Sequence, residues 1–323
     1  MTLELDDDFW EDLLILLDEG KVIPVIGSGV VTRGDDQSLL YPWLARRVAE
    51  KLDISTDSLP LDFDLNAVAT EYILNRGDGS KIYTRLARIL REECPSPGQS
   101  LLDLASVSAF NLYLTTTFDP LLQQALNSVR HGGANATTVC AFTPEGETED
   151  LPDLPVRRRE LPGTTVFHIL GRVSPTPKYV VWEDDMLEFI FSLNKKMPER
   201  LGRDLKEHGL LFLGLNFSDW LVRFFLRVSK QKPLSTPHVH RAYFADGLGD
   251  FPSQSMVLFF GAVSRDIHVM RQNPVAFCAE LARRWKARHP TEPSEAKLRL
   301  PTTTLEMPRG AIFVSYARED EAA

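Results

Sequence analysis

The sequence has few cysteines, with three in 323 residues. Cys94, Cys140 and Cys278 are scattered, and no two of them have the C-x-x-C spacing. A disulfide framework needs paired cysteines and a cysteine zinc site needs closely spaced ligands, so this pattern indicates neither. We therefore expect reduced cysteines and no bound metal.

Long apolar runs and an excess of basic charge are also missing. No apolar run approaches the roughly 18 residues of a spanning helix, and Met1–Asp8 lacks the basic and apolar regions of a signal peptide. The formal net charge is −9, which supplies no general surface for nucleic acid. The basic run Arg157–Arg159 is better interpreted as a solvated loop than as a binding patch. These absences predict a cytoplasmic protein with no membrane or nucleic-acid partner.

The most informative stretch is Val22–Val31, in which a β-branched apolar run ends in Gly27-Ser28-Gly29. This pattern is typical of a buried strand that leads into a tight turn. Glycine has no Cβ, so such a turn lets backbone N–H groups approach a phosphate. The full G-x-G-x-x-G fingerprint is absent because Thr32 holds its last position, so a purely structural strand-to-helix turn remains an equal alternative.

The rest of the chain alternates between strand and helix patterns. Such repetition predicts an α/β fold, a Rossmann-like parallel sheet flanked by helices, with an inserted helical subdomain at about 53–105. Ligands in such sheets bind at the carboxyl ends of the strands. Further strands are expected at 110–117, 164–170, 179–182, 210–215, 240–244, 256–260 and 267–270, and further helices at 43–52, 65–74, 82–93, 121–129, 184–193, 195–208, 220–228 and 274–288.

Three of the expected strand ends carry polar or glycine-rich turns, at Gly27–Gly29, Thr116–Asp119 and Gly214–Asn216. The segments VIPVIGSG, LTTTFD, VFHILG and LFLGLNFSD, taken in this order, resemble the sirtuin-like domain of bacterial immune proteins. The resemblance spans about residues 10 to 285 and places one sirtuin-like domain within residues 1–288.

This resemblance implies an NAD⁺ pocket, which relatives use to cleave the bond between nicotinamide and ribose during phage infection. On this basis Gly27, Ser28 and Gly29 match the pyrophosphate loop. The later loop near the adenosine ribose is matched by Gly214, Leu215 and Asn216, and Val30, Thr116 and Gly171 complete the expected ligand-binding set. The zinc-binding cysteines of protein-deacylating sirtuins have no counterpart, so the resemblance implies neither zinc nor lysine deacylation.

Two positions depart from the family pattern. Thr117 stands where relatives carry an asparagine, and its hydroxyl lacks the paired donor and acceptor of an amide. Relatives carry a histidine base directly before the glycine that ends the third strand, whereas this chain has Leu170 before Gly171 and His168 two residues earlier. An offset of two keeps His168 on the same strand face but about 6.5 Å farther back.

Several candidate residues keep alternative interpretations. His168 is either a structural histidine, which we favour, or a relocated base. Asp119 either contacts the nicotinamide amide, as the resemblance implies, or caps the helix that begins at Leu121. Asn216 either contacts ligand or is an ordinary helix cap.

The end of the chain has a different composition. Residues 289–309 are rich in proline and polar residues and are typical of a linker. Residues 310–323 contain the segment AIFVSYARED, which resembles the first strand and following loop of a TIR domain.

Three functional hypotheses follow. We favour a catalytically impaired module that binds NAD⁺ or an ADP-ribose derivative and regulates or assembles a C-terminal TIR effector in antiphage defence, as a homo-oligomer. The second hypothesis is an NAD⁺ glycohydrolase that uses Thr117, Asp119 and His168. The third is an oligomerisation scaffold that binds no nucleotide.

Overall fold

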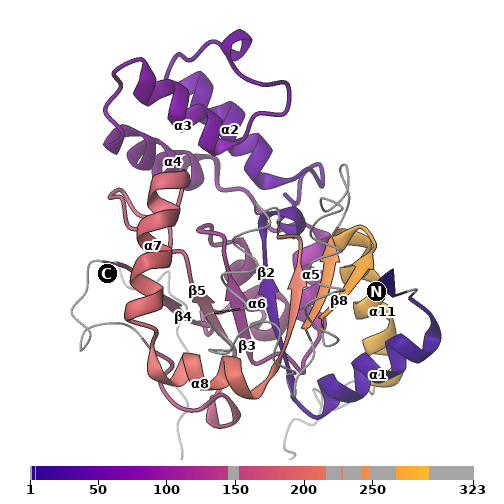
Figure 1. Ribbon diagram of the computed structural model, residues 1–323. Helices are drawn as coiled ribbons and strands as arrows, with labels where there is room; N and C mark the ends of the chain where they lie inside the picture. The colour runs from indigo at the N-terminus through magenta and orange to yellow at the C-terminus, as the bar shows by residue number, and fades with distance from the viewer. Residues whose placement is uncertain are drawn as a thin grey trace, which may run out of the picture.

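A parallel β-sheet forms the centre of the protein in its computed structural model (Figure 1). The structure describes residues 2–3, 5–144, 153–215, 227, 242–246 and 267–290. Within these residues the sheet has eight strands in the order β1-β8-β7-β6-β2-β3-β5-β4, and every neighbouring pair is parallel. The strands are β1 (Thr2–Leu3), β2 (Val22–Ile26), β3 (Leu112–Thr115), β4 (Thr138–Ala141), β5 (Thr165–His168), β6 (Gly209–Leu213), β7 (Ala242–Asp246) and β8 (Ile267–Arg271).

The two central strands explain why the sheet is parallel and covered on both faces. β2 and β6 pair from Val22 opposite Gly209 to Ile26 opposite Leu213, and every residue of both strands is buried. Uninterrupted apolar strands need a layer of helices on each side, which βαβ connections supply. The Rossmann-like α/β arrangement expected from the sequence is confirmed.

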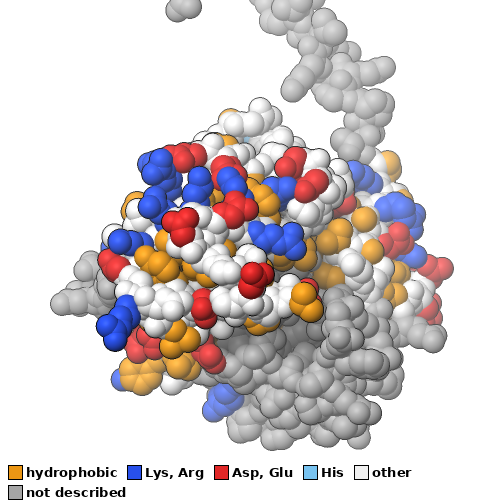
Figure 2. Space-filling view, turned by 90° about the horizontal axis from the view of Figure 1, so that it is seen from above, with side chains coloured by type: hydrophobic (Ala, Val, Ile, Leu, Met, Phe, Trp, Pro, Cys, Tyr) orange, Lys and Arg blue, Asp and Glu red, His pale blue; other side chains and the backbone are white. Residues whose placement is uncertain are grey.

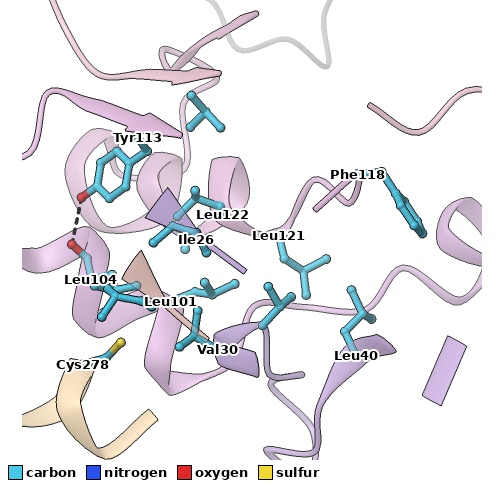
Figure 3. Close-up of a cluster of buried hydrophobic side chains, with 14 of the residues drawn as sticks. Ile26, Val30, Leu40, Leu101, Leu104, Tyr113, Phe118, Leu121, Leu122 and Cys278 are labelled. Carbon is cyan, nitrogen blue, oxygen red and sulfur yellow. Dashed lines mark hydrogen bonds between the residues drawn. The ribbon is translucent and has the colours of Figure 1, made fainter. Parts of the chain in front are cut away.

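The helices that flank the sheet form two layers. Side chains of α1 (Asp7–Asp18), α5 (Gln99–Ser106), α6 (Leu121–His131) and α11 (Pro274–Arg288) share one core cluster with the sheet. Figure 3 shows part of this cluster, in which the Tyr113 hydroxyl donates to the Leu104 carbonyl and Cys278 of α11 lies nearby. Side chains of α7 (Glu183–Lys195) and α8 (Glu199–Glu207) pack on the opposite face in a second cluster.

A separate group of helices lies beyond the sheet, at the top of Figure 1. It consists of α2 (Leu40–Lys51), α3 (Leu65–Leu74) and α4 (Ser80–Glu93), and α2 packs against both of the others. α4 is amphipathic and buries Tyr83, Leu86 and Ile89, which belong to the same core cluster as the sheet. This group overlaps the helical insertion expected at about 53–105, but it begins earlier, at Leu40, and ends at Glu93. The helix that follows, α5, instead packs against α6 and α11.

The strand expected at 179–182 is wrong. Only Tyr179 makes a sheet-like contact, an isolated antiparallel bridge to Gly171. The reason is that both edges of β5 are already occupied, by β3 and β4, so no ladder position is left beside it. Tyr179 and Val181 are buried in the core cluster, which accounts for their apolar pattern.

The helix expected at 195–208 is present as α8, but it begins four residues later than expected. α7 ends at Lys195 and α8 begins at Glu199, directly after Pro198. Proline has no N–H and disfavours helical geometry at the residue before it, so the helix cannot run through this point. α5 is not among the expected helices, although its apolar residues Leu101, Leu104 and Ala105 have helical spacing.

The remaining expected elements agree in kind with the structure and differ by a few residues at their ends, except where the chain is not described. Outside the described residues lie the strand expected at 256–260, the helix expected at 220–228 except residue 227, and everything beyond residue 290, including the expected TIR strand. Among the described helices, none has the length and apolar character to cross a membrane.

Candidate functional site

A cavity of about 370 Å³ lies at the carboxyl ends of β2, β3 and β5, beneath α2 and α3. This is the edge of a parallel sheet at which ligands bind. Its lining is mainly apolar with several hydroxyl groups, and it consists of Ser28, Leu39, Tyr41, Pro42, Asp64, Leu65, Asn66, Thr116, Thr117, Phe118, Leu170, Val180, Val181, Trp182, Glu183 and Met186.

The loops after β2 and β6 touch backbone to backbone at the glycines predicted to bind ligand. The Gly27 N–H donates to the Leu213 carbonyl at 2.9 Å, and the Gly29 N–H donates to the Gly214 carbonyl at 2.7 Å. A Cβ added at Gly27 would lie 2.2 Å from the Gly214 oxygen, so no larger residue fits without moving backbone. These glycines therefore have a demonstrable packing role, and Ser28 between them lines the cavity.

The other predicted ligand-binding residues divide into two groups. Thr116 lines the cavity, and its hydroxyl donates to the Ile26 carbonyl at 3.1 Å. Val30 is buried in the core cluster of Figure 3, and Gly171, with a φ of +83°, packs against Tyr179. Neither Val30 nor Gly171 lines the cavity. Gly214 and the half-buried Leu215 do not line it either. Asn216 lies outside the described residues.

Thr117 reaches the cavity from the end of β3 and is almost fully buried. Its hydroxyl lies 2.8 Å from that of Thr115, and its backbone N–H donates to the same Thr115 oxygen at 3.1 Å. The Thr117 side chain is therefore fixed by its own strand end. A hydroxyl held in this way can exchange one hydrogen bond with a ligand but cannot replace an amide.

His168 is the last residue of β5 and is 1% exposed. Its Nδ1 lies 2.8 Å from the Thr117 carbonyl oxygen. Because a carbonyl only accepts hydrogen bonds, Nδ1 carries the proton, and Nε2 has no partner among the described residues. Burial lowers the pKa of His168 to about 4, so the ring is neutral near pH 7.

The cavity lining holds Leu170, and His168 is not part of it. The position that the resemblance assigns to a histidine base thus carries an alkyl side chain in direct contact with the cavity. A leucine can exclude water from a bound ring but cannot move a proton.

Asp119 is buried beneath the loop that follows β3, with both carboxylate oxygens in hydrogen bonds. Oδ1 accepts from the Leu121 N–H at 3.0 Å, at the first residue of α6, and Oδ2 accepts from the Tyr41 hydroxyl at 3.0 Å. Burial raises the pKa of Asp119, although these hydrogen bonds oppose the shift. The helix-capping contact is present, and a contact to nicotinamide stays a prediction.

Tyr41 is a cavity residue that the sequence analysis missed. It lies near the start of α2, and its hydroxyl accepts from the Phe118 N–H at 2.9 Å while it donates to Asp119. The ring also packs edge-on against Phe118, with centroids 5.1 Å apart. Partners 77 and 78 residues apart leave no local signal in the sequence that would pair them.

Hydrogen bonds join the helical insertion to the first turn of α7 and to the segment before it, on one side of the cavity. The Glu183 N–H donates to the Asn66 Oδ1 at 3.0 Å, and the Tyr83 hydroxyl donates to the Asp185 Oδ1 at 2.5 Å. The Tyr179 hydroxyl donates to the Tyr83 carbonyl at 3.3 Å. The insertion therefore covers the cavity as part of the folded core.

The cavity lining carries no lysine, arginine or histidine among the described residues, and its charged side chains are Asp64 and Glu183. On the outer face of the helical insertion, basic and acidic side chains are interspersed (Figure 2). A ligand in this cavity is thus recognised by its shape, apolar surface and hydrogen bonds more than by side-chain cations.

Residues 111–267 match the family model described as a SIR2-like domain. The matched part includes β3, β5 and β6, with Thr117, Asp119, His168 and Gly214, whereas Gly27–Gly29 lies before it. The match supports the sirtuin-like part of the resemblance. No curated protein matches the chain. Among the described residues, no group of three or more His, Cys, Asp or Glu side chains is arranged to hold a metal ion.

Proposed function

We propose that this chain is a sirtuin-like module that binds NAD⁺ or an ADP-ribose-containing nucleotide in the cavity and does not hydrolyse it. The match of residues 111–267 to a SIR2-like domain supports an NAD-related ligand. The place of the cavity, at the carboxyl ends of parallel strands, supports the same site.

The observation that carries the proposal is that the expected base position holds Leu170, while the nearest histidine, His168, lies two residues earlier. Leu170 lines the cavity where the resemblance expects a base, and His168 is buried outside it with a pKa of about 4. A correctly placed general base contributes about 10²–10⁴-fold to a reaction. Nicotinamide release by this domain is therefore expected to be negligible while nucleotide binding persists.

The test is to incubate the purified chain with NAD⁺, to follow nicotinamide by chromatography, and to measure NAD⁺ and ADP-ribose binding by calorimetry on the same sample. We expect binding without release. Leu170→Trp, which fills the cavity, should weaken binding at least about tenfold, whereas Leu187→Trp on the exposed face of α7 should not.

Two other outcomes would point to the alternative functions. Release of nicotinamide that disappears in His168→Asn would establish an NAD⁺ glycohydrolase with a relocated base and would contradict the proposal. If neither release nor binding is found at any protein concentration, the oligomerisation scaffold is the better account.

We further propose that nucleotide binding controls assembly of a homo-oligomer and, through it, a TIR effector that follows residue 310, in bacterial antiphage defence. The support is the resemblance of residues 311–320 to the start of a TIR domain. In a protein carrying a complete TIR domain, ADP-ribose or NAD⁺ should change both the oligomeric state and the TIR activity. An effect on neither would contradict this role.

A further inference from the structure

The Tyr41 hydroxyl bonds two neighbouring groups at the edge of the cavity, the Phe118 N–H and the Asp119 carboxylate. The Phe118 N–H donates to its hydroxyl oxygen at 2.9 Å, and the hydroxyl hydrogen is donated to Asp119 Oδ2 at 3.0 Å. The other Asp119 oxygen accepts from the Leu121 N–H, so Oδ2 is the oxygen that lies on the Tyr41 side of the carboxylate.

A backbone N–H beside a carboxylate oxygen is the complement of a primary carboxamide. A carboxamide offers a carbonyl oxygen that accepts a hydrogen bond and an NH₂ group that donates one. A hydroxyl group also both accepts and donates, through its single oxygen. The Tyr41 hydroxyl therefore stands in for the amide of a ligand. Tyr41 and Phe118 both line the cavity, so a ligand there lies within reach of this pair.

The Tyr41 ring is held in this position by more than its hydroxyl. The Leu40 N–H donates to the Val31 carbonyl at 2.8 Å, which anchors the start of α2, and the Tyr41 ring packs edge-on against Phe118. Phe118 in turn packs against Tyr179, with ring centroids 4.7 Å apart. Moving Tyr41 aside would cost the Phe118 N–H and the buried Asp119 carboxylate one hydrogen bond each until a ligand replaced them, which is costly.

We propose that Tyr41 fills the carboxamide position of the cavity, so that the site binds ADP-ribose and related nucleotides without a carboxamide in preference to NAD⁺. This inference rests on the proposed function and specifies its ligand. Tyr41 is thus a specificity-determining residue, and the domain senses the product side of NAD⁺ consumption rather than NAD⁺ itself.

The experiment measures dissociation constants of ADP-ribose and NAD⁺ for the wild-type chain, Tyr41→Ala and Leu39→Ala. Wild type should bind ADP-ribose at least as tightly as NAD⁺. Tyr41→Ala vacates the position and should improve NAD⁺ binding about tenfold relative to ADP-ribose, since one or two hydrogen bonds are gained. Leu39→Ala enlarges the same wall of the cavity without touching the pair and should leave the ratio unchanged.

A third probe identifies the group that is recognised. Nicotinic acid adenine dinucleotide carries a carboxylate, which has no N–H to donate and repels Asp119. Tyr41→Ala should therefore gain affinity for NAD⁺ but not for this analogue.

The inference is overturned if wild type prefers NAD⁺ at least tenfold over ADP-ribose, or if a folded Tyr41→Ala variant keeps the wild-type ratio. If Tyr41→Ala does not fold, Tyr41→Ser also removes the ring and should shift the ratio in the same direction. Binding of ADP-ribose with an unchanged ratio removes only this inference, whereas no binding of any of the three nucleotides to any variant removes the proposed function with it.

Discussion

His168 lies two residues before Leu170, the residue that lines the cavity, and is therefore too deep in the sheet to take part in chemistry there. Its side chain shares a sheet face with Val166 and points toward the packed helices, and its Nδ1–H is committed to the Thr117 carbonyl. Burial favours the uncharged ring, which lowers its pKa from the ordinary 6.5 to about 4. The same burial that makes His168 a poor base makes it a source of pH-dependent stability.

The folded chain should lose stability on acidification in part because of His168. Between pH 6.5 and pH 4 the unfolded chain binds a proton that the folded chain does not, so this stability is complete above pH 6.5 and declines as the pH falls. The contribution lost between pH 7 and pH 5 is about 2 kcal/mol. His168→Asn keeps an N–H for Thr117 and does not titrate, so urea unfolding at both pH values should show a smaller loss.

Other buried groups do not confuse this comparison. Burial raises the pKa values of Asp119 and Asp185, so acidification increases their contribution to the free energy of unfolding, opposite to the effect of His168. This contribution is the same in the wild type and in the variant. Equal losses of stability on acidification in the two proteins would show that folding does not lower the pKa of His168.

At the scale of elements, the site depends on the contact between the loops after β2 and β6. The strands pair along their whole length, and the loops continue that contact because glycine stands at both Gly27 and Gly214. Gly214 has a φ of +63°, in the left-handed region that side chains disfavour, and a Cβ there would lie 2.6 Å from the backbone of Gly29 and Val30. Ser28 is placed in the cavity by this contact.

Gly27→Ala should destabilise the fold and weaken nucleotide binding together. The added methyl would lie 2.2 Å from a backbone oxygen, which cannot rotate away, so the two loops must separate. Overpacking of this kind costs about 1–3 kcal/mol, which thermal unfolding can measure. Gly163→Ala is the matched control, since nothing lies within 4 Å of a Cβ there. Similar melting temperatures for the two variants would contradict the packing role.

At the scale of the whole molecule, one arginine joins three distant segments at the end of the sheet opposite the cavity. Arg158, in the 3₁₀ turn η3 (Arg158–Glu160), is buried and donates to the carbonyls of Gly20 and Val22 and to the side chain of Asn111. Its backbone N–H donates to Asp204 Oδ2 at 3.3 Å. The interpretation of this basic run as a solvated loop is therefore wrong for its middle residue.

Arg158→Lys should lower the free energy of unfolding by about 2–4 kcal/mol. A lysine ammonium cannot reproduce the planar fork that reaches these acceptors, so buried carbonyl groups lose their partners. Arg159→Lys, at the exposed neighbouring position, is the control and should stay within about 0.5 kcal/mol of wild type in urea unfolding. Equal effects would mean that Arg158 contributes only its charge.

The sequence by itself determined the elements whose residues carry a periodic pattern. α3 has the expected bounds, and the apolar runs of β2 and β6 predicted central strands, because burial on both faces demands continuous apolar residues. A periodic apolar pattern was enough to predict an element whose bounds depend on neighbouring residues in the sequence. Local patterns placed the start of α8 four residues too early, before Pro198, and they predicted a strand at Tyr179, where the filled edges of β5 decide that none forms.

Only the tertiary structure decided what the candidate site contains. The sequence placed Ser28, Thr116 and Thr117 at strand ends, and their meeting at one cavity follows from parallel pairing. It gave no signal for Tyr41 on Asp119 or for the burial of His168, since both depend on contacts between residues 51 to 78 positions apart. Strand order and loop packing set those contacts, and a sequence pattern with a period of two or 3.6 residues carries no information about them.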